Sequence, residues 1–198
     1  MSIPFVGLTG GLGAGKSEAL RALADLGAAT LSTDAVVHEL LASDDMRDLV
    51  VERLGAEVAP GGTLDRTLIA ERVFGDESAR TWLEGVLWPR VGERVAGWRA
   101  QRESADQPPR AAVVEVPLLF ESGMDAVFDA TIAVIAPESL REERAAARGH
   151  ASLAERAGRQ LSQDEKAARA SFTVRNDGSL ADLQAALAEV LAKLDDTR

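Results

Sequence analysis

Residues 10–17 read Gly10-Gly11-Leu12-Gly13-Ala14-Gly15-Lys16-Ser17, and this stretch decides the fold class. It matches the pattern G-x-x-x-x-G-K-[ST] at every fixed position. Glycines let the backbone wrap around a phosphate group with its N–H groups turned inward, in conformations that a side chain would obstruct. The apolar run 3–8 predicts a buried strand before the motif, and the pattern of 17–26 predicts a helix after it. A strand, a loop and a helix in this order form a P-loop.

A P-loop predicts a nucleoside triphosphate as the ligand. The start of the following helix offers unpaired N–H groups and the positive end of its dipole to phosphate. Lys16 supplies a charge for the β- and γ-phosphates, and the hydroxyl of Ser17 is a ligand for Mg²⁺. The rival dinucleotide pattern G-x-G-x-x-G fails, because its third glycine position is Lys16. We therefore expect ATP and Mg²⁺ as cofactors. The expected nucleotide-binding residues of this segment are Gly10, Gly11, Gly13, Ala14, Gly15, Lys16, Ser17 and Glu18.

Strand patterns and helical patterns alternate at both ends of the chain. This alternation favours a parallel sheet flanked by helices and, with the motif, predicts an α/β P-loop NTPase fold. Two capping boxes, Ser152 to Glu155 and Ser162 to Glu165, mark further helix starts. The expected strands are 3–8, 28–31, 111–116, 130–136 and 172–174, and the expected helices around them are 17–26, 34–41, 137–148 and 179–194.

The middle of the chain differs, because residues 44–102 read as almost entirely helical. Pro60-Gly61-Gly62 interrupts this region, and Pro89 should kink or break its long amphipathic stretch. A helical block inserted into an α/β chain is often a substrate-binding region, although plain core helices are the alternative. We expect a single P-loop kinase domain over 1–198. Its parts are a core of about 1–43, 111–137 and 171–198, a helical acceptor-binding insertion of about 44–104, and a helical lid of about 138–170.

Composition excludes several classes of protein. A chain of 198 residues allows one compact domain at roughly 150 residues per domain. The absence of cysteine excludes disulfides, thiolate metal sites and cysteine catalysis. No apolar run approaches the roughly 20 residues of a membrane span, and the net charge of −10 argues against broad nucleic-acid binding. We expect a cytoplasmic, monomeric enzyme with small-molecule substrates and no membrane or nucleic-acid partner.

Among P-loop proteins, a small-molecule kinase fits this chain best. The guanine-reading N-K-x-D tetrad is absent, and the chain is short for a motor ATPase. A kinase needs a carboxylate to orient or deprotonate the acceptor hydroxyl. Asp34 follows the second predicted strand, at the edge where ligands of open α/β sheets bind, although it could merely cap the next helix. Glu115 ends an apolar strand and could assist Mg²⁺ through water, or could be a solvated strand end.

A kinase lid needs cations that cover the transferring phosphoryl group. Arg141, Arg144 and Arg148 recur at i, i+3 and i+7, which places them on one helical face. The alternative is a solvated face paired with the neighbouring glutamates. We expect one or two of these arginines to act.

The sequence resembles the bacterial dephospho-coenzyme A kinases, over essentially its whole length and in order. The most specific string is V-P-L-L-F-E at 116–121. The other segments that carry the resemblance are Val6 to Ser17, Leu64-Asp65-Arg66 with Val73-Phe74, and Gln160, Glu165-Lys166, Asn176 and Gly178.

The resemblance implies ATP-dependent phosphorylation of the ribose 3′-hydroxyl of dephospho-coenzyme A, the last step of coenzyme A synthesis. By position, Asp34 would be the catalytic base. Lys16 and Arg144 would act on the phosphoryl group, and Arg148 would belong to the lid helix. Asn176 and Gly178 would lie near the adenine of ATP.

Four residues depart from the family pattern, and several of them fall on the acceptor side. Ser32 and Ser171 replace aspartates, His38 replaces an arginine, and Trp88 replaces a histidine. A histidine replaces an arginine only in part, because it lacks the bidentate fork. Two alternatives therefore stay open: a kinase of the same fold acting on another nucleoside or nucleotide-like hydroxyl, and a nucleotide-binding protein that has lost transfer.

Overall fold

The computed structural model describes residues 3–147 and 160–196. The chain divides into two compact units, of which the second comprises residues 33–98 and the first comprises the rest. No helix in the described ranges combines the length and the apolar character that a membrane crossing requires.

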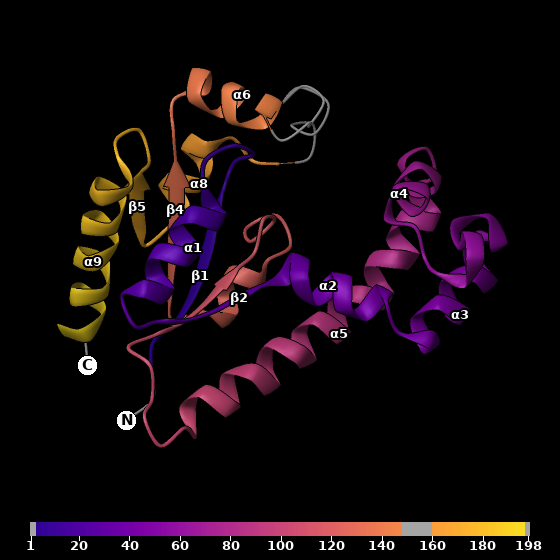
Figure 1. The fold of residues 1–198 in the computed structure, drawn as a ribbon, viewed down its shortest axis with the longest axis horizontal. Coiled ribbons are helices and arrows are strands. Elements are labelled where there is room, and N and C mark those ends of the chain that lie inside the picture. The colour runs from indigo at the N-terminus through magenta and orange to yellow at the C-terminus, as the bar shows by residue number, and fades with distance from the viewer. Residues whose placement is uncertain (1–2, 148–159, 197–198) are drawn as a thin grey trace. The chain divides into compact units, whose positions relative to one another are not determined.

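A five-stranded parallel sheet organises the first unit (Figure 1). The strand order is β2-β3-β1-β4-β5. Since β1 is central, the loop that follows it leaves the middle of the sheet, which confirms the predicted α/β P-loop fold. The strands are β1 (Phe5–Gly10), β2 (Ala29–Ser32), β3 (Ala112–Glu115), β4 (Ala130–Ile135) and β5 (Phe172–Arg175).

Helices cover the sheet and bury its apolar side chains. Helices α1 (Lys16–Asp25) and α9 (Leu180–Asp196) pack together over one core, which includes Val6 and Leu8 of β1. Side chains alternate between the faces of a strand, so Thr9 faces away from that core. Helix α8 (Gln163–Arg169) lies against β4 and also contacts β1. The short 3₁₀ turn η3 (Met124–Val127) directly precedes β4, and helix α6 (Glu138–Ala147) directly follows β4.

Helix boundaries follow the local signals of the sequence. Gly27 has a φ of 92° just after α1, as expected for a glycine at a helix C-terminus. The capping box at Ser162 is confirmed, because its hydroxyl accepts from the N–H of Glu165 while that carboxylate accepts from the N–H of Ser162. The second box, at Ser152, lies outside the described residues.

The second unit is helical around its own apolar cluster. Its cluster includes Met46, Val50, Leu83 and Leu87. The Asp65 carboxylate accepts hydrogen bonds from two N–H groups at the start of α4, so part of the L-D-R string acts as a helix cap. The elements of this unit are α2 (Thr33–Leu41), α3 (Asp44–Leu54), η1 (Ala56–Val58), η2 (Pro60–Gly62), α4 (Arg66–Phe74) and α5 (Glu77–Glu103), whose last residues enter the first unit.

Two boundaries differ from the sequence-based expectation. Helix α5 continues through Pro89 rather than breaking there, because Leu83, Leu87 and Val91 keep one buried face across the proline. The second unit begins at Thr33, ahead of the expected residue 44, because α2 packs against α3 once the chain has left the sheet.

Candidate active site

The P-loop connects β1 to α1 and presents backbone N–H groups. Gly13 and Gly15 have φ values of 76° and 94°, in the left-handed region that favours glycine. The loop is closed by a hydrogen bond of 3.2 Å from the Ala14 N–H to the Gly11 carbonyl. The N–H groups of Gly13, Gly15 and Ser17 make no hydrogen bond to the described part of the chain. Such unpaired donors at a helix start form an anion-binding cradle.

Lys16 lies across the mouth of this loop. Its Nζ donates to the carbonyl oxygens of Gly10 at 3.0 Å and Gly11 at 3.1 Å. The ammonium is therefore held beside the cradle by contacts with the loop itself. A charge in this place is suited to the β- and γ-phosphates of a nucleotide.

The residues around Ser17 fit a metal ion that arrives with the nucleotide. Ser17 is half-buried at the start of α1, and its hydroxyl makes no hydrogen bond within the described residues. The described ranges contain no group of three or more histidine or carboxylate side chains that could hold a metal alone. Mg²⁺ needs no such group, because it usually takes one or two protein oxygens, water and the substrate phosphates.

Asn176 joins three parts of the first unit at the P-loop. It is buried, and its Nδ2 donates to the Ala14 carbonyl at 2.9 Å. Its own carbonyl accepts a hydrogen bond of 3.2 Å from Nη1 of Arg144 on α6. The structure therefore brings Asn176 and Arg144 together against the loop. Gly178 lies two residues further on in an exposed turn beside Asp182.

Arg141, one of the candidate lid arginines, contacts the P-loop directly. Its Nε donates to the Leu12 carbonyl at 3.0 Å, and its guanidinium lies over Gly11. Its backbone lies against Gly13, where a Cβ would collide with it. The helical spacing of Arg141 and Arg144 was visible in the sequence, but the contact with the loop was not. Arg148 lies outside the described residues.

Gly15→Ala is expected to weaken ATP binding through the backbone alone. The new Cβ would require a left-handed conformation and would collide with Nδ2 of Asn176. Such strain costs on the order of 1–3 kcal/mol, equivalent to roughly 5- to 150-fold in affinity. Calorimetric titration with MgATP measures it. Gly97→Ala is the matched control, because it lies in a helix with open space around it; equal affinities in both variants would contradict the cradle.

Asp34 belongs to the second unit, in the first turn of α2 and two residues beyond the end of β2. Its side chain is exposed and makes no hydrogen bond or ion pair with the described residues. The carboxylate is therefore not used as a helix cap. His38 is also exposed, four residues later on the same helix. Glu115 is buried at the end of β3, where the register pairs it with Ser32 and Leu8.

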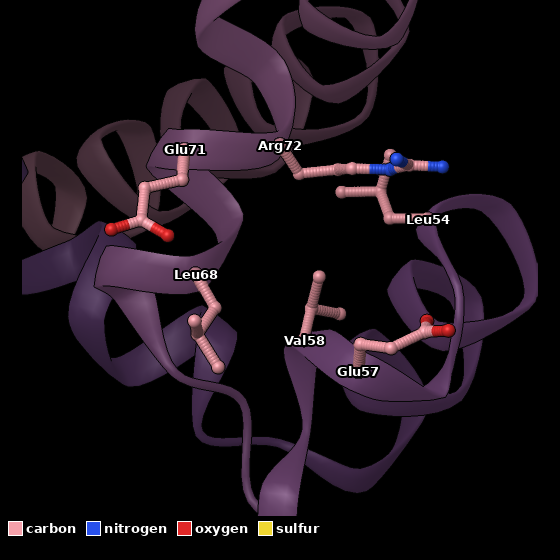
Figure 2. A pocket seen from close by; sticks show the side chains of 6 residues that line it. All are labelled: Leu54, Glu57, Val58, Leu68, Glu71 and Arg72. Atoms are coloured by element: carbon pink, nitrogen blue, oxygen red, sulfur yellow. The ribbon is translucent and has the colours of Figure 1, made fainter.

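A cavity of about 400 Å³ in the second unit lies apart from the predicted site residues. Figure 2 shows it between the end of α3, η1 and α4, with both apolar and charged side chains around it. None of the predicted site residues lines it. Its lining residues are Leu54, Glu57, Val58, Leu68, Glu71 and Arg72.

Comparisons with known proteins point to one family. The family model described as "Dephospho-CoA kinase" matches residues 4–182. A dephospho-CoA kinase of Protochlamydia amoebophila is 40% identical over 194 residues, covering 96% of this chain and 95% of that protein. A solved structure from Thermus thermophilus is similar with a TM-score of 0.81 and 33% identity, covering 98% of this chain and 99% of that one. The dephospho-CoA kinase structure from Campylobacter jejuni shares the fold with a TM-score of 0.70 at 24% identity, covering 98% of each chain.

Proposed function

The chain belongs to the dephospho-CoA kinase family, and we propose that it transfers the γ-phosphoryl group of ATP to the ribose 3′-hydroxyl of dephospho-coenzyme A. The products are coenzyme A and ADP. The observation that carries the proposal is the P-loop, with its unpaired N–H groups and Lys16 at its mouth, in a chain that matches the family over most of its length.

The donor side of the reaction rests on the first unit. The N–H groups of Gly13, Gly15 and Ser17 would bind the β-phosphate region of ATP. Lys16 would leave its contacts with the loop carbonyls and bind the β- and γ-phosphates, where it offsets the charge that moves to the leaving oxygen. Positioning and charge stabilisation account for most of the catalysis in this class of reaction.

The acceptor side rests on Asp34. Its exposed carboxylate has no partner in the described part of the chain, so both oxygens are available to a hydroxyl group. Asp34 would accept the proton of the 3′-hydroxyl as that oxygen attacks the γ-phosphorus, while the bond to the bridging oxygen of ADP breaks. Asp34 would thus act as the catalytic base.

Arginines of the lid region would complete the donor site. Arg144 is fixed through the carbonyl of Asn176, so its charge stays close to the P-loop. It would neutralise charge on the transferring phosphoryl group. Asn176 and Gly178 would lie at the adenine end of ATP, and Arg148 would add a further cation from the lid.

The proposal includes Mg²⁺ held by Ser17 and the ATP phosphates, with Glu115 reaching it through water. The bound ion would neutralise phosphate charge and hold the β- and γ-phosphates in one geometry. We also propose that the enzyme is a cytoplasmic monomer.

The test is ADP release from MgATP with and without dephospho-coenzyme A, with adenosine and AMP as rival acceptors. We expect release that depends on dephospho-coenzyme A, with coenzyme A identified as the product by mass spectrometry. The departures at Ser32, His38 and Trp88 make the rival acceptors a necessary arm. Release that depends on another acceptor would overturn the assigned substrate, and ATP binding without any release would overturn the transfer reaction.

A further inference from the structure

A buried ion pair lies on the face of the sheet opposite the α1–α9 core. Lys166, on α8, has no exposed surface, and its Nζ lies 3.0 Å from Oε1 of Glu121. Glu121 closes the V-P-L-L-F-E string after β3, and Lys166 belongs to the E-K string. Both strings carry the family resemblance, yet neither residue has a part in the transfer step described above.

Lys166 uses all the hydrogens of its ammonium group. Nζ donates to the Pro117 carbonyl at 2.6 Å and to Oγ1 of Thr9 at 3.4 Å, in addition to Glu121. An ammonium group has three hydrogens, one for each of these contacts, and the neighbouring Glu121 carboxylate favours this charged form. Burial lowers the pKa of Lys166, and the contact with Glu121 opposes that change.

These contacts reach the strand that carries the P-loop. Thr9 directly precedes Gly10, whose carbonyl accepts a hydrogen bond from Lys16. The Thr9 hydroxyl also donates to the Pro117 carbonyl at 3.3 Å. Lys166 therefore fixes the end of β1 against the segment that follows β3, immediately before the phosphate-binding loop.

The same pair holds the segment that leads into α8. Oε1 of Glu121 accepts a hydrogen bond of 2.8 Å from the N–H of Leu161. Two residues later, the Gln163 amide pairs with both backbone groups of Ala136, at 2.9 and 3.1 Å. Ala136 lies just ahead of α6, so the two ends of the lid region are tied to each other and, through Glu121, to β1.

Stability alone does not account for this pair. Burying two charges carries a desolvation cost, and apolar side chains of similar size often stabilise a fold equally well or better. The other oxygen of Glu121 is buried and has no hydrogen-bond partner among the described residues, which adds to that cost. An ion pair does fix the relative positions of its neighbours, and apolar contacts do so less strictly.

We propose that Lys166 and Glu121 are positioning residues for phosphoryl transfer. They hold Thr9 and Pro117 against the segment that leads into α8, so that the P-loop keeps its ATP-binding geometry. Through its contact with Thr9, which precedes Gly10, Lys166 affects the position of the Lys16 ammonium group. Small displacements of such a site cost on the order of 10- to 100-fold in rate. This inference rests on the proposed kinase reaction.

The test compares Lys166→Met with the double variant Lys166→Met/Glu121→Leu. The single variant leaves a carboxylate buried without its cation, so we expect a lower Tm and lower activity. The double variant removes both charges, so its Tm should recover. Its Kd for MgATP should stay raised about tenfold and its kcat lowered about tenfold or more, with the KM for dephospho-coenzyme A unchanged. Recovery of Tm, Kd and kcat together would overturn the proposal.

Two further variants separate an effect on ATP binding from a loss of stability. Glu121→Gln retains an acceptor for the Leu161 N–H but removes the charge; wild-type ATP affinity in this variant would also overturn the proposal, even if the double variant failed to fold. Ser171→Ala is the matched control, because it removes the hydrogen bond from the Thr131 N–H just after α8, and this bond involves no residue of β1. It should lower Tm and leave kcat and Kd unchanged. The MgATP titrations contain no acceptor, so they test the pair even if dephospho-coenzyme A is not the substrate.

Discussion

Asp34→Asn should lower kcat by a factor on the order of 10²–10⁴ and leave ATP binding nearly intact. Asparagine has the size of aspartate and still accepts a hydrogen bond, but it cannot take the proton of the acceptor hydroxyl. The wild-type carboxylate is exposed and makes no hydrogen bond or ion pair with the described residues. Its replacement should therefore leave the fold unchanged, and the loss should appear in turnover alone.

The measurement is single-turnover formation of coenzyme A, with the affinity for MgATP measured separately by calorimetry. Glu39→Gln is the matched control, since it removes an exposed carboxylate from the same helix. The control should retain wild-type turnover. If Asp34→Asn did so too, Asp34 could not be the base, and the donor site would have to transfer phosphate without a carboxylate at this position.

The P-loop could be predicted because its signals are local. Its glycines, Lys16 and the flanking apolar pattern lie within one short segment, and each has a direct physical reason. The contact of Arg141 with Leu12 could not be predicted in the same way, because these residues lie 129 positions apart. They meet because β4 lies beside β1 in the sheet, and that order is set by the packing of the whole unit.

Lys166 shows a second limit of sequence-based prediction. A lysine in a short polar helix reads as exposed, because lysine is rarely buried unless it is paired. Its partner Glu121 belongs to another element, so no helical spacing reveals the pair. Asp34 shows the reverse case: its place after a strand was visible in the sequence, while only the structure shows that it makes no capping hydrogen bond to the described residues. Its role as the base stays a prediction.

Lys16→Ala should raise the KM for ATP and lower kcat by a factor on the order of 10²–10³. The ammonium donates to two loop carbonyls, and Lys16 is not one of the residues of the apolar core, so its loss removes a charge without opening that core. Lys16→Arg should recover little, because a planar guanidinium does not occupy the place of a compact ammonium. The effect should appear in both ATP affinity and kcat, since the ammonium group contacts the phosphates in the ATP complex and during transfer.

The small number of lysines makes this prediction open to a direct chemical test. The chain has lysines only at positions 16, 166 and 193. Lys166 is fully buried and Lys193 is exposed on α9. An amine-acylating reagent should therefore label Lys16 and Lys193 in the free enzyme, and saturating MgATP should protect Lys16 alone. Lys193→Ala is the matched kinetic control. A lysine that neutralises the γ-phosphate cannot remain free to react. If ATP left the labelling of Lys16 unchanged and Lys16→Ala kept wild-type kinetics, these results would contradict the contact of Lys16 with the phosphates.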